Sequence, residues 1–447
     1  MRTLLRQFLV RVPLGIGMLC LVLSAALSLP VPVKADGLAS VPLEIVDSDR
    51  TELGDGLAHY RYDAVVGSGK YDVVRIHRIV REDRPNKPVR TRDAVMLLHG
   101  NPGSFAGFVA PMVTGVSEMD HSIAIFLAKQ DIDVWGMDFG WALVPPEETD
   151  FEFMGDWGLA KDVAHTEAAL TFARSIRVDT GQGNGKLHVL GFSYGGQVGY
   201  TLLGNETVQP RGLRNVKGMI VLDVGVKLEN EGDREFYCAM ALIDQASLES
   251  DPPVYVNKIG SLFNLAAYLA STDPTGMSPI PGFEWLPNWQ AVLFIGASTE
   301  LITGQFWHMV GGYLDEYGVP SSLRFTEDQL FVATVGTTFA PYYPVRIDFD
   351  TEQMMCGVVD TPLDDGLSQI TVPILHIGAK GGFGPSAYAS STFTASRDVT
   401  TITVQRLPDS DEAMDFGHVD TVLARDAETL VWQPILDWIM AHRENRP

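Results

Sequence analysis

The pentapeptide Gly-Phe-Ser-Tyr-Gly at residues 191–195 constrains the fold of this chain more than any other feature. A short, mostly apolar run at residues 187–190 leads into it, and a segment of small residues typical of a helix, residues 195–203, follows it directly. A strand that turns sharply into a helix needs flanking glycines, because larger side chains there would collide with the neighbouring strand and helix. We therefore expect Ser193 at the C-terminal edge of a sheet, in front of a helix N-terminus.

Segments typical of strands and of helices alternate along most of the chain. Short apolar runs such as residues 94–98 suit buried parallel strands, because parallel sheets are covered on both faces. We expect strands at residues 60–66, 71–80, 94–98, 131–138, 187–190, 217–224, 372–378 and 400–406, and helices at residues 123–129, 155–175, 195–203 and 419–442. This alternation predicts an α/β fold with a doubly wound, mostly parallel sheet.

Residues 226–370 interrupt this alternation. They contain helical stretches at residues 236–246 and 258–269, many prolines and several aromatic residues. We interpret the segment as a large, mainly helical cap inserted into the core, which is thereby divided into residues 36–225 and 371–447. A second domain with a core of its own is the alternative.

Residues 1–35 are predicted to be a secretory signal peptide. Three arginines precede the uncharged stretch 12–33, and small residues around Ala35 suit a signal peptidase. Cleavage after Ala35 would give a secreted or periplasmic protein. An uncleaved N-terminal anchor is the alternative, because an uncharged stretch of this length could span a bilayer. No later segment is long and apolar enough to span a membrane, so we expect no stable span after cleavage.

Two cysteines, Cys238 and Cys356, remain after that cleavage. In an oxidising compartment two cysteines can pair, but the sequence does not tell whether these two lie close enough. A disulfide and two separate buried thiols therefore both remain open.

The charge balance and the missing motifs exclude several functions. The chain has 56 Asp and Glu against 33 Lys and Arg, a net charge of −23, which argues against nucleic acid as a partner. There is no His-Glu-x-x-His, Cys-x-x-Cys or phosphate-binding Gly-x-x-x-x-Gly-Lys motif, so we expect no metal and no cofactor. Asp348, Asp350 and Glu352 alternate as they would on one face of a strand, and we expect them on a solvated surface.

A second motif could supply hydrogen bonds beside Ser193. Residues 97–103, Leu-Leu-His-Gly-Asn-Pro-Gly, form a glycine-rich turn after an earlier strand. The backbone N–H of Asn101, together with that of Tyr194, could form an oxyanion hole for the charge that develops in acyl transfer. We interpret His99 as a structural hydrogen-bonding residue rather than a base.

A third motif supplies the base. A serine hydroxyl is a poor nucleophile until a base accepts its proton. His418, in Phe-Gly-His-Val-Asp at residues 416–420 just before the last predicted helix, is the expected general base. His376 lies within an apolar strand and is expected to be a core residue.

These three motifs, in this order, resemble the α/β-hydrolase superfamily, and the resemblance covers nearly all of the chain after the signal peptide except the cap. The superfamily usually places a third catalytic acid after the strand at residues 372–378, but no carboxylate follows that strand here before Asp398. Some members place the acid after the preceding strand, where Asp223 lies. Asp223 is therefore the candidate acid, and Asp398, Asp409, Asp411 or no acid at all remain alternatives.

The resemblance implies an exported serine hydrolase that cleaves carboxylic esters. Ser193 would form an acyl-enzyme, His418 would act as general base, and the substrate would be a small-molecule or lipid-like ester. Dehalogenase and epoxide-hydrolase chemistry is disfavoured, because haloalkane dehalogenases use an aspartate nucleophile at the position of Ser193. A catalytically silent binding protein on the same fold, or a serine peptidase or amidase, is the alternative.

Overall fold

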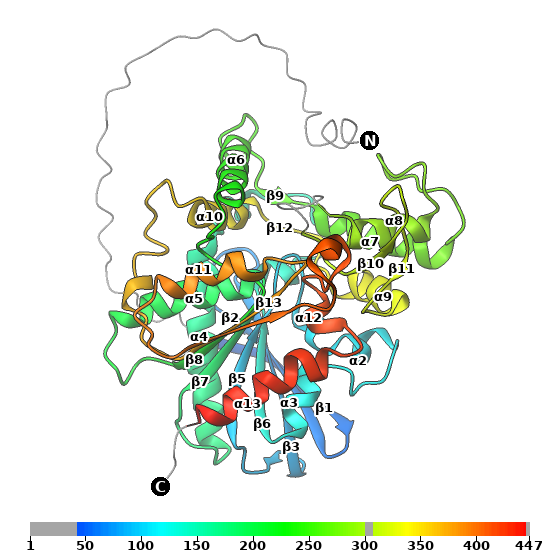
Figure 1. Cartoon of the computed structure of the whole chain (residues 1–447). Helices are drawn as coiled ribbons and strands as arrows, with labels where there is room; N and C mark the ends of the chain where they lie inside the picture. Colours follow the sequence, from blue (N-terminus) through cyan, green and yellow to red (C-terminus); the bar gives the residue numbers. More distant parts are fainter. Residues whose placement is uncertain (1–42, 300–306, 444–447) are drawn as a thin grey trace, which may run out of the picture.

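The computed structural model describes residues 43–299 and 307–443, so the predicted signal peptide lies outside the described residues. A ten-stranded sheet forms the centre of the described chain (Figure 1), in the order β1-β2-β3-β6-β5-β7-β8-β13-β14, with β4 paired to β3. Its strands are β1 (Glu44–Gly54), β2 (Leu57–Val65), β3 (Val73–Arg84), β4 (Lys87–Pro88), β5 (Asp93–Leu98), β6 (Ile132–Asp138), β7 (Leu187–Phe192), β8 (Val216–Leu222), β13 (Ile374–Ala379) and β14 (Val399–Val404).

The sheet is mixed but mostly parallel. Strands β6, β5, β7, β8, β13 and β14 run parallel to one another, whereas β1, β2 and β3 form an antiparallel edge that joins β6. All residues of β5, β6 and β13 are buried, as expected for strands covered on both faces. This architecture confirms the predicted α/β fold.

Helices cover both faces of the sheet and divide the core into two layers. Along β5, Val95 and Leu97 belong to one hydrophobic cluster, whereas Met96 and Leu98 belong to the other, because successive side chains of a strand point to opposite faces. The first layer contains α3 (Ile123–Lys129) and α13 (Gln433–Ala441), and the second contains α4 (Leu159–Asp179) and α5 (Tyr194–Thr207). None of the helices in the described ranges is long and apolar enough to cross a membrane.

The single closing helix predicted at residues 419–442 is wrong. The structure has a short α12 (Asp420–Leu423), then a π-helical turn over Glu428–Trp432 that continues into α13. The helix breaks because the backbone N–H of Arg425 donates to the carbonyl of Phe325, in the insertion, at 3.0 Å. A tertiary contact thus replaces the next intrahelical hydrogen bond.

The insertion leaves the sheet after β8 and returns to it at β13, which pairs directly with β8. Its main helices lie above the sheet in two groups (Figure 1). One group is α6 (Glu231–Leu248) and α10 (Val345–Cys356), and the other is α7 (Ile259–Thr272), α8 (Asn288–Ala297) and α9 (Asp328–Thr338). A disulfide between Cys238 on α6 and Cys356 on α10 joins the first of these helices to the last.

The expected strand carrying Asp348, Asp350 and Glu352 is also wrong, since these residues lie on α10. These residues do not lie on a solvated surface, because the fold buries them in part. Glu352, for example, is only 8% exposed. The carboxyl groups of Asp348 and Asp350 accept hydrogen bonds from other parts of the chain, which explains how they can be taken out of water.

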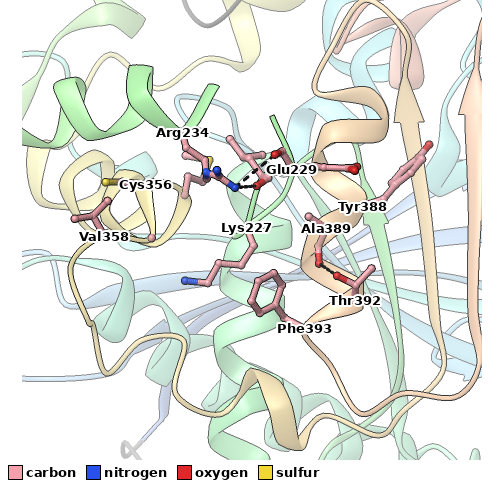
Figure 2. Close-up of a pocket in the computed structure, with 12 residues that line it drawn as sticks. Lys227, Glu229, Arg234, Cys356, Val358, Tyr388, Ala389, Thr392 and Phe393 are labelled. Carbon is pink, nitrogen blue, oxygen red and sulfur yellow. Dashed lines mark hydrogen bonds between the residues drawn. The ribbon is translucent and has the colours of Figure 1, made fainter. Parts of the chain in front are cut away.

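A cavity of about 670 Å³ lies beside the disulfide (Figure 2). Leu228, Met355 and Phe393 contribute apolar walls, and Lys227 and Arg234 contribute cations. The ammonium group of Lys227 is paired with Asp364 at 2.5 Å, and the guanidinium group of Arg234 donates to the carbonyls of Leu228 and Glu229 at 3.5 Å each. Neither Ser193 nor His418 lines it.

Removing the disulfide should destabilise the protein. It joins residues 118 positions apart, and such cross-links typically stabilise a protein by about 2–4 kcal/mol, largely by restricting the unfolded chain. Urea denaturation should show a free energy of unfolding lower by that amount in the Cys238→Ser/Cys356→Ser double variant. Reductant should weaken the wild type and leave the double variant unchanged; equal stability of the oxidised wild type and the double variant would contradict the prediction.

Candidate active site

Ser193 lies on a sharp turn between β7 and α5. Its backbone has φ 52° and ψ −130°, a conformation that residues other than glycine rarely adopt. The turn is possible because Gly191 and Gly195 flank it: a Cβ at Gly195 would collide with the carbonyl of Leu98, and one at Gly191 with the carbonyl of Gly195. Ser193 is half-buried.

The glycine-rich turn after β5 touches this serine. A Cβ at Gly100 would lie 2.6 Å from the Cβ of Ser193, so only glycine fits there. Within the described chain, the N–H of the next residue, Asn101, donates no hydrogen bond. The N–H of Tyr194 is the first of α5 and has no acceptor inside the helix. Two N–H groups without an acceptor among the described residues therefore belong to Tyr194, which follows the serine, and to Asn101, which follows the glycine that touches the serine.

The imidazole of His418 pairs with the carboxyl group of Asp223. Nδ1 of His418 lies 2.7 Å from Oδ2 of Asp223, which directly follows β8 and is fully buried. The same carboxyl group accepts hydrogen bonds from the N–H groups of Ala379, Phe383 and Gly384, at 2.8, 3.2 and 3.1 Å. These bonds fix the orientation of the carboxyl group, and through it the orientation of the imidazole.

Two contacts connect this pair to the serine turn. The N–H of Ser193 donates to the carbonyl of Leu222 at 3.1 Å, and the residue after Leu222 is Asp223. The ring of Phe192 stacks on the imidazole of His418 with 4.7 Å between the ring centres. These contacts place the serine turn and the imidazole–carboxyl pair at the C-terminal ends of β7 and β8, but among the described residues no hydrogen bond joins Oγ of Ser193 to the imidazole of His418.

The other predicted candidates lie elsewhere. Asp398 is exposed and pairs with His442, and Asp409 accepts a hydrogen bond from Gln405; neither they nor Asp411 contact His418. The two other histidines considered from the sequence, His376 and His99, are both buried. His376 is fully enclosed on β13, where burial lowers its pKa to about 4. For His99, Nδ1 lies 2.9 Å from the carbonyl of Gly100, and Nε2 accepts the N–H of Phe139 at 3.3 Å.

Sequence reasoning missed a carboxyl group that holds the side chain of Tyr194. Asp162, on α4, is fully buried and accepts hydrogen bonds from the hydroxyl of Tyr194 at 2.7 Å and from the indole N–H groups of Trp141 and Trp157 at 3.0 Å each. Burial raises the pKa of Asp162 to about 6. Only its place beside apolar residues of a predicted helix distinguishes it in the sequence.

A second missed carboxyl group, that of Asp420, holds the loop of His418. Oδ2 accepts the N–H groups of Gly417 and Gly311 at 2.8 Å each, and Oδ1 accepts the hydroxyl of Thr326 at 2.6 Å. Gly311 and Thr326 belong to the insertion. The position of the imidazole therefore depends on residues far from it in the sequence.

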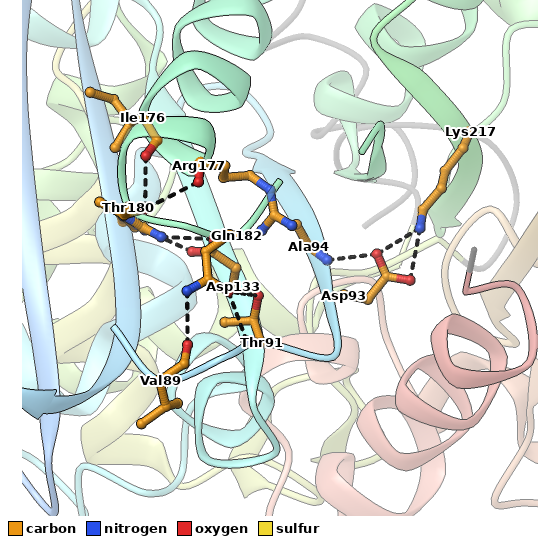
Figure 3. Close-up of polar contacts among 11 residues, drawn as sticks. Val89, Thr91, Asp93, Ala94, Asp133, Ile176, Arg177, Thr180, Gln182 and Lys217 are labelled. Atoms are coloured by element: carbon orange, nitrogen blue, oxygen red, sulfur yellow. Dashed lines mark hydrogen bonds and ion pairs between the residues drawn. The ribbon is translucent and has the colours of Figure 1, made fainter. Parts of the chain in front are cut away.

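Charged residues at the opposite edge of the parallel strands form ion pairs of their own (Figure 3). Asp133, near the start of β6, lies 2.6 Å from Nη1 of Arg177, and Asp93, at the start of β5, lies 2.7 Å from Nζ of Lys217. These pairs satisfy buried charges at the end of the sheet away from the serine. In the described ranges, no group of His, Cys, Asp and Glu side chains is suited to hold a metal ion.

The Asp420→Asn variant should change how stability depends on pH. Burial raises the pKa of Asp420 in the folded protein to about 7, well above the ordinary value of about 3.9 in the unfolded chain. The folded state therefore binds more protons between these values, so wild-type stability should fall as pH rises from about 4 to about 7, by at most about 1.4 kcal/mol per pH unit.

Asparagine at position 420 does not bind the proton that Asp420 binds. The free energy of unfolding of the wild type minus that of the variant should therefore decrease as pH rises over that range. Urea denaturation at pH 4.5, 5.5, 6.5 and 7.5 measures this difference. A difference that stays constant with pH would contradict the raised pKa of Asp420.

No family model and no curated protein matches the sequence. Among solved structures, a candidate lipase from Sulfolobus solfataricus is 19% identical, covers 90% of this chain and 99% of its own, and has a TM-score of 0.60. A monoglyceride lipase from Saccharomyces cerevisiae is 13% identical, with coverage of 91% and 99% and a TM-score of 0.47. A proline iminopeptidase from Mycobacterium smegmatis is 15% identical, with coverage of 89% and 98% and a TM-score of 0.40. At such low identities only the architecture can be compared, and the first of these similarities extends over nearly the whole described chain. The fold of this chain is that of the α/β-hydrolases.

Proposed function

We propose that this protein is a serine hydrolase that cleaves carboxylic esters through an acyl-enzyme on Ser193. The observation that carries the proposal is the occurrence of three features at the same end of the parallel strands: a serine on a strained turn, an imidazole paired with a buried carboxyl group, and two N–H groups without an acceptor among the described residues. Ester hydrolysis by a serine requires all three together: a nucleophile, a base that is held in place by an acid, and donors that stabilise the oxyanion.

In the proposed reaction, Oγ of Ser193 attacks the ester carbonyl while Nε2 of His418 accepts the hydroxyl proton. Asp223 holds Nδ1–H of the imidazole and stabilises its cationic form. The N–H groups of Asn101 and Tyr194 stabilise the negative oxygen of the tetrahedral intermediate. The imidazole then gives its proton to the leaving alcohol, and a water molecule, activated in the same way, releases the acid from Ser193.

Aromatic side chains around the imidazole support an apolar substrate. The rings of Phe192, Trp307 and Phe383 lie with their centres 4.7, 5.5 and 5.7 Å from that of His418. Apolar walls with few polar anchors are typical of sites that bind apolar ligands. A lipid-like ester is therefore the proposed substrate class, which agrees with the description of the Sulfolobus solfataricus protein as a candidate lipase. Export by the predicted signal peptide, cleaved after Ala35, is part of the same proposal.

A fluorophosphonate probe should label Ser193, because the oxygen of a serine activated by an adjacent base displaces fluoride from the probe and becomes phosphonylated. Labelling and hydrolysis of p-nitrophenyl butyrate should both be lost in Ser193→Ala, with kcat reduced by at least about 10³-fold. Ser321→Ala, which changes an exposed serine on the cap strand β11 (Pro320–Leu323), is the matched control and should behave as wild type. Wild-type protein that neither binds the probe nor hydrolyses any ester in a chain-length panel would rule the proposal out.

The Asp223→Asn variant should keep the fold and lose most activity. Asparagine has nearly the same shape, but it cannot stabilise the imidazolium as a carboxylate does, and comparable changes lower kcat by about 10²–10⁴-fold. Asp398→Asn removes a carboxylate that pairs with another histidine, His442, and should leave kcat within about twofold of wild type. Steady-state kinetics on one ester compares the two variants, and similar kcat values for both would exclude Asp223 as the acid.

A further inference from the structure

The loop that carries Asn101 is held in its middle by the insertion rather than by the core. Its two ends are fixed by core contacts: His99 binds the carbonyl of Gly100, and the N–H of Phe105 donates to Asp138 at 2.6 Å. Between these ends, the carbonyl of Pro102 accepts the N–H of Ala340 at 2.7 Å, and the hydroxyl of Ser104 donates to the carbonyl of Thr338 at 2.7 Å.

The third contact of this loop is made by a carboxyl group of the cap. Nδ2 of Asn101 donates to Oδ1 of Asp348, on α10, at 3.1 Å. This is the one hydrogen bond that the side chain of Asn101 makes to any described residue. Because the side chain and the backbone N–H of Asn101 share one Cα, fixing the side chain restricts the direction of the N–H.

Asp348 is itself held firmly enough to act as an anchor. Its other oxygen, Oδ2, accepts the hydroxyl of Tyr343 at 2.9 Å and Nδ2 of Asn257 at 3.0 Å. These two partners belong to the paired cap strands β9 (Val256–Asn257) and β12 (Tyr343–Pro344). Oδ1 remains for Asn101, so both oxygens of the carboxyl group are used and its orientation is determined.

We propose that Asp348 is a positioning residue of the oxyanion hole: it holds the side chain of Asn101 so that the backbone N–H of Asn101 points to the oxygen that becomes negative. The cap then takes part in catalysis through this contact, in addition to covering the substrate. The inference rests on the proposed ester hydrolysis and adds to it a residue that does not touch the substrate.

Loss of the contact between Asp348 and Asn101 should lower kcat rather than change KM. An oxyanion hole acts where charge develops in the transition state, and losing one donor typically costs about 10²–10³-fold in kcat. Loss of an anchor misaligns a donor without removing it, so Asp348→Ala should lower kcat by about 10–100-fold and change KM by less than about threefold.

Asp350→Ala is the matched control. Asp350 lies on the same helix, and its carboxyl group also joins the cap to the core, by accepting the N–H of Leu159 at 2.9 Å. That contact joins α10 to the start of α4 and does not involve the loop that carries Asn101. We expect Asp350→Ala to lower the melting temperature about as much as Asp348→Ala, while kcat stays within about twofold of wild type.

A double-mutant cycle separates positioning from general destabilisation. Asn101→Ala keeps the backbone N–H but removes the group that Asp348 binds, so it should lower kcat as much as Asp348→Ala does. If both act through one hydrogen bond, the double variant should be no worse than either single variant. The kinetics use p-nitrophenyl butyrate and full-length protein, with folding checked by circular dichroism.

Three results would overturn the inference: wild-type kcat in Asn101→Ala, equal kcat loss in Asp348→Ala and Asp350→Ala, or multiplicative losses in the double variant. Should Asp348→Ala not fold, Asn101→Ala alone decides, because it leaves Asp348 bound to Tyr343 and Asn257. A wild type whose activity depends on Ser193, with kcat unaffected in these variants, refutes only this inference. A wild type without Ser193-dependent activity refutes the proposed function and this inference with it.

Discussion

The contact between His418 and Asp223 joins residues 195 positions apart, and the arrangement of the candidate site depends on it. The carboxyl group is held by N–H groups from the segment after β13, and the imidazole lies on the loop that follows β14. The contact therefore spans the pairing of β8 with β13, the strands on either side of the insertion. The pairing of β7 with β8 brings the carbonyl of Leu222 to the N–H of Ser193. The pairing of β8 with both β7 and β13 thus places the groups of the candidate site at one edge of the sheet.

The insertion contributes to the site on both sides of the serine. On one side, Gly311 and Thr326 bind the carboxyl group of Asp420 and so hold the loop of the imidazole. On the other side, Ala340 binds the carbonyl of Pro102, in the turn that carries Asn101. A segment that only covered a substrate would not need these contacts. The insertion instead completes the surroundings of the groups to which we assign the chemistry.

The sequence predicted the features that depend on local rules. Fully buried parallel strands are apolar throughout, so residues 94–98 and 187–190 were identifiable, and a strand that turns directly into a helix requires glycines at fixed positions around Ser193. Asp223 was a candidate for a different reason, because the resemblance to the α/β-hydrolases implies that some members place the acid after this strand. The structure places its carboxyl group beside His418, and its catalytic role remains our proposal.

The features that the sequence could not predict depend on distant partners. Asp162 can be buried only because Trp141, Trp157 and Tyr194 converge on it. The break near Arg425 exists because a carbonyl of the insertion accepts its N–H. The alternating acids at 348, 350 and 352 were read as a strand, because period-two spacing outweighed the helical surroundings that the fold imposes.

The central claim is that Ser193 becomes acylated during turnover. Intact-protein and peptide mass spectrometry, after brief reaction with p-nitrophenyl acetate and an acid quench, tests it most directly. The account predicts an acetyl adduct on the peptide that contains Ser193, formed in a burst of p-nitrophenol of about one equivalent per protein molecule and lost on further incubation. Ester hydrolysis without an adduct and without a burst, or with the acetyl group on another residue, would contradict it.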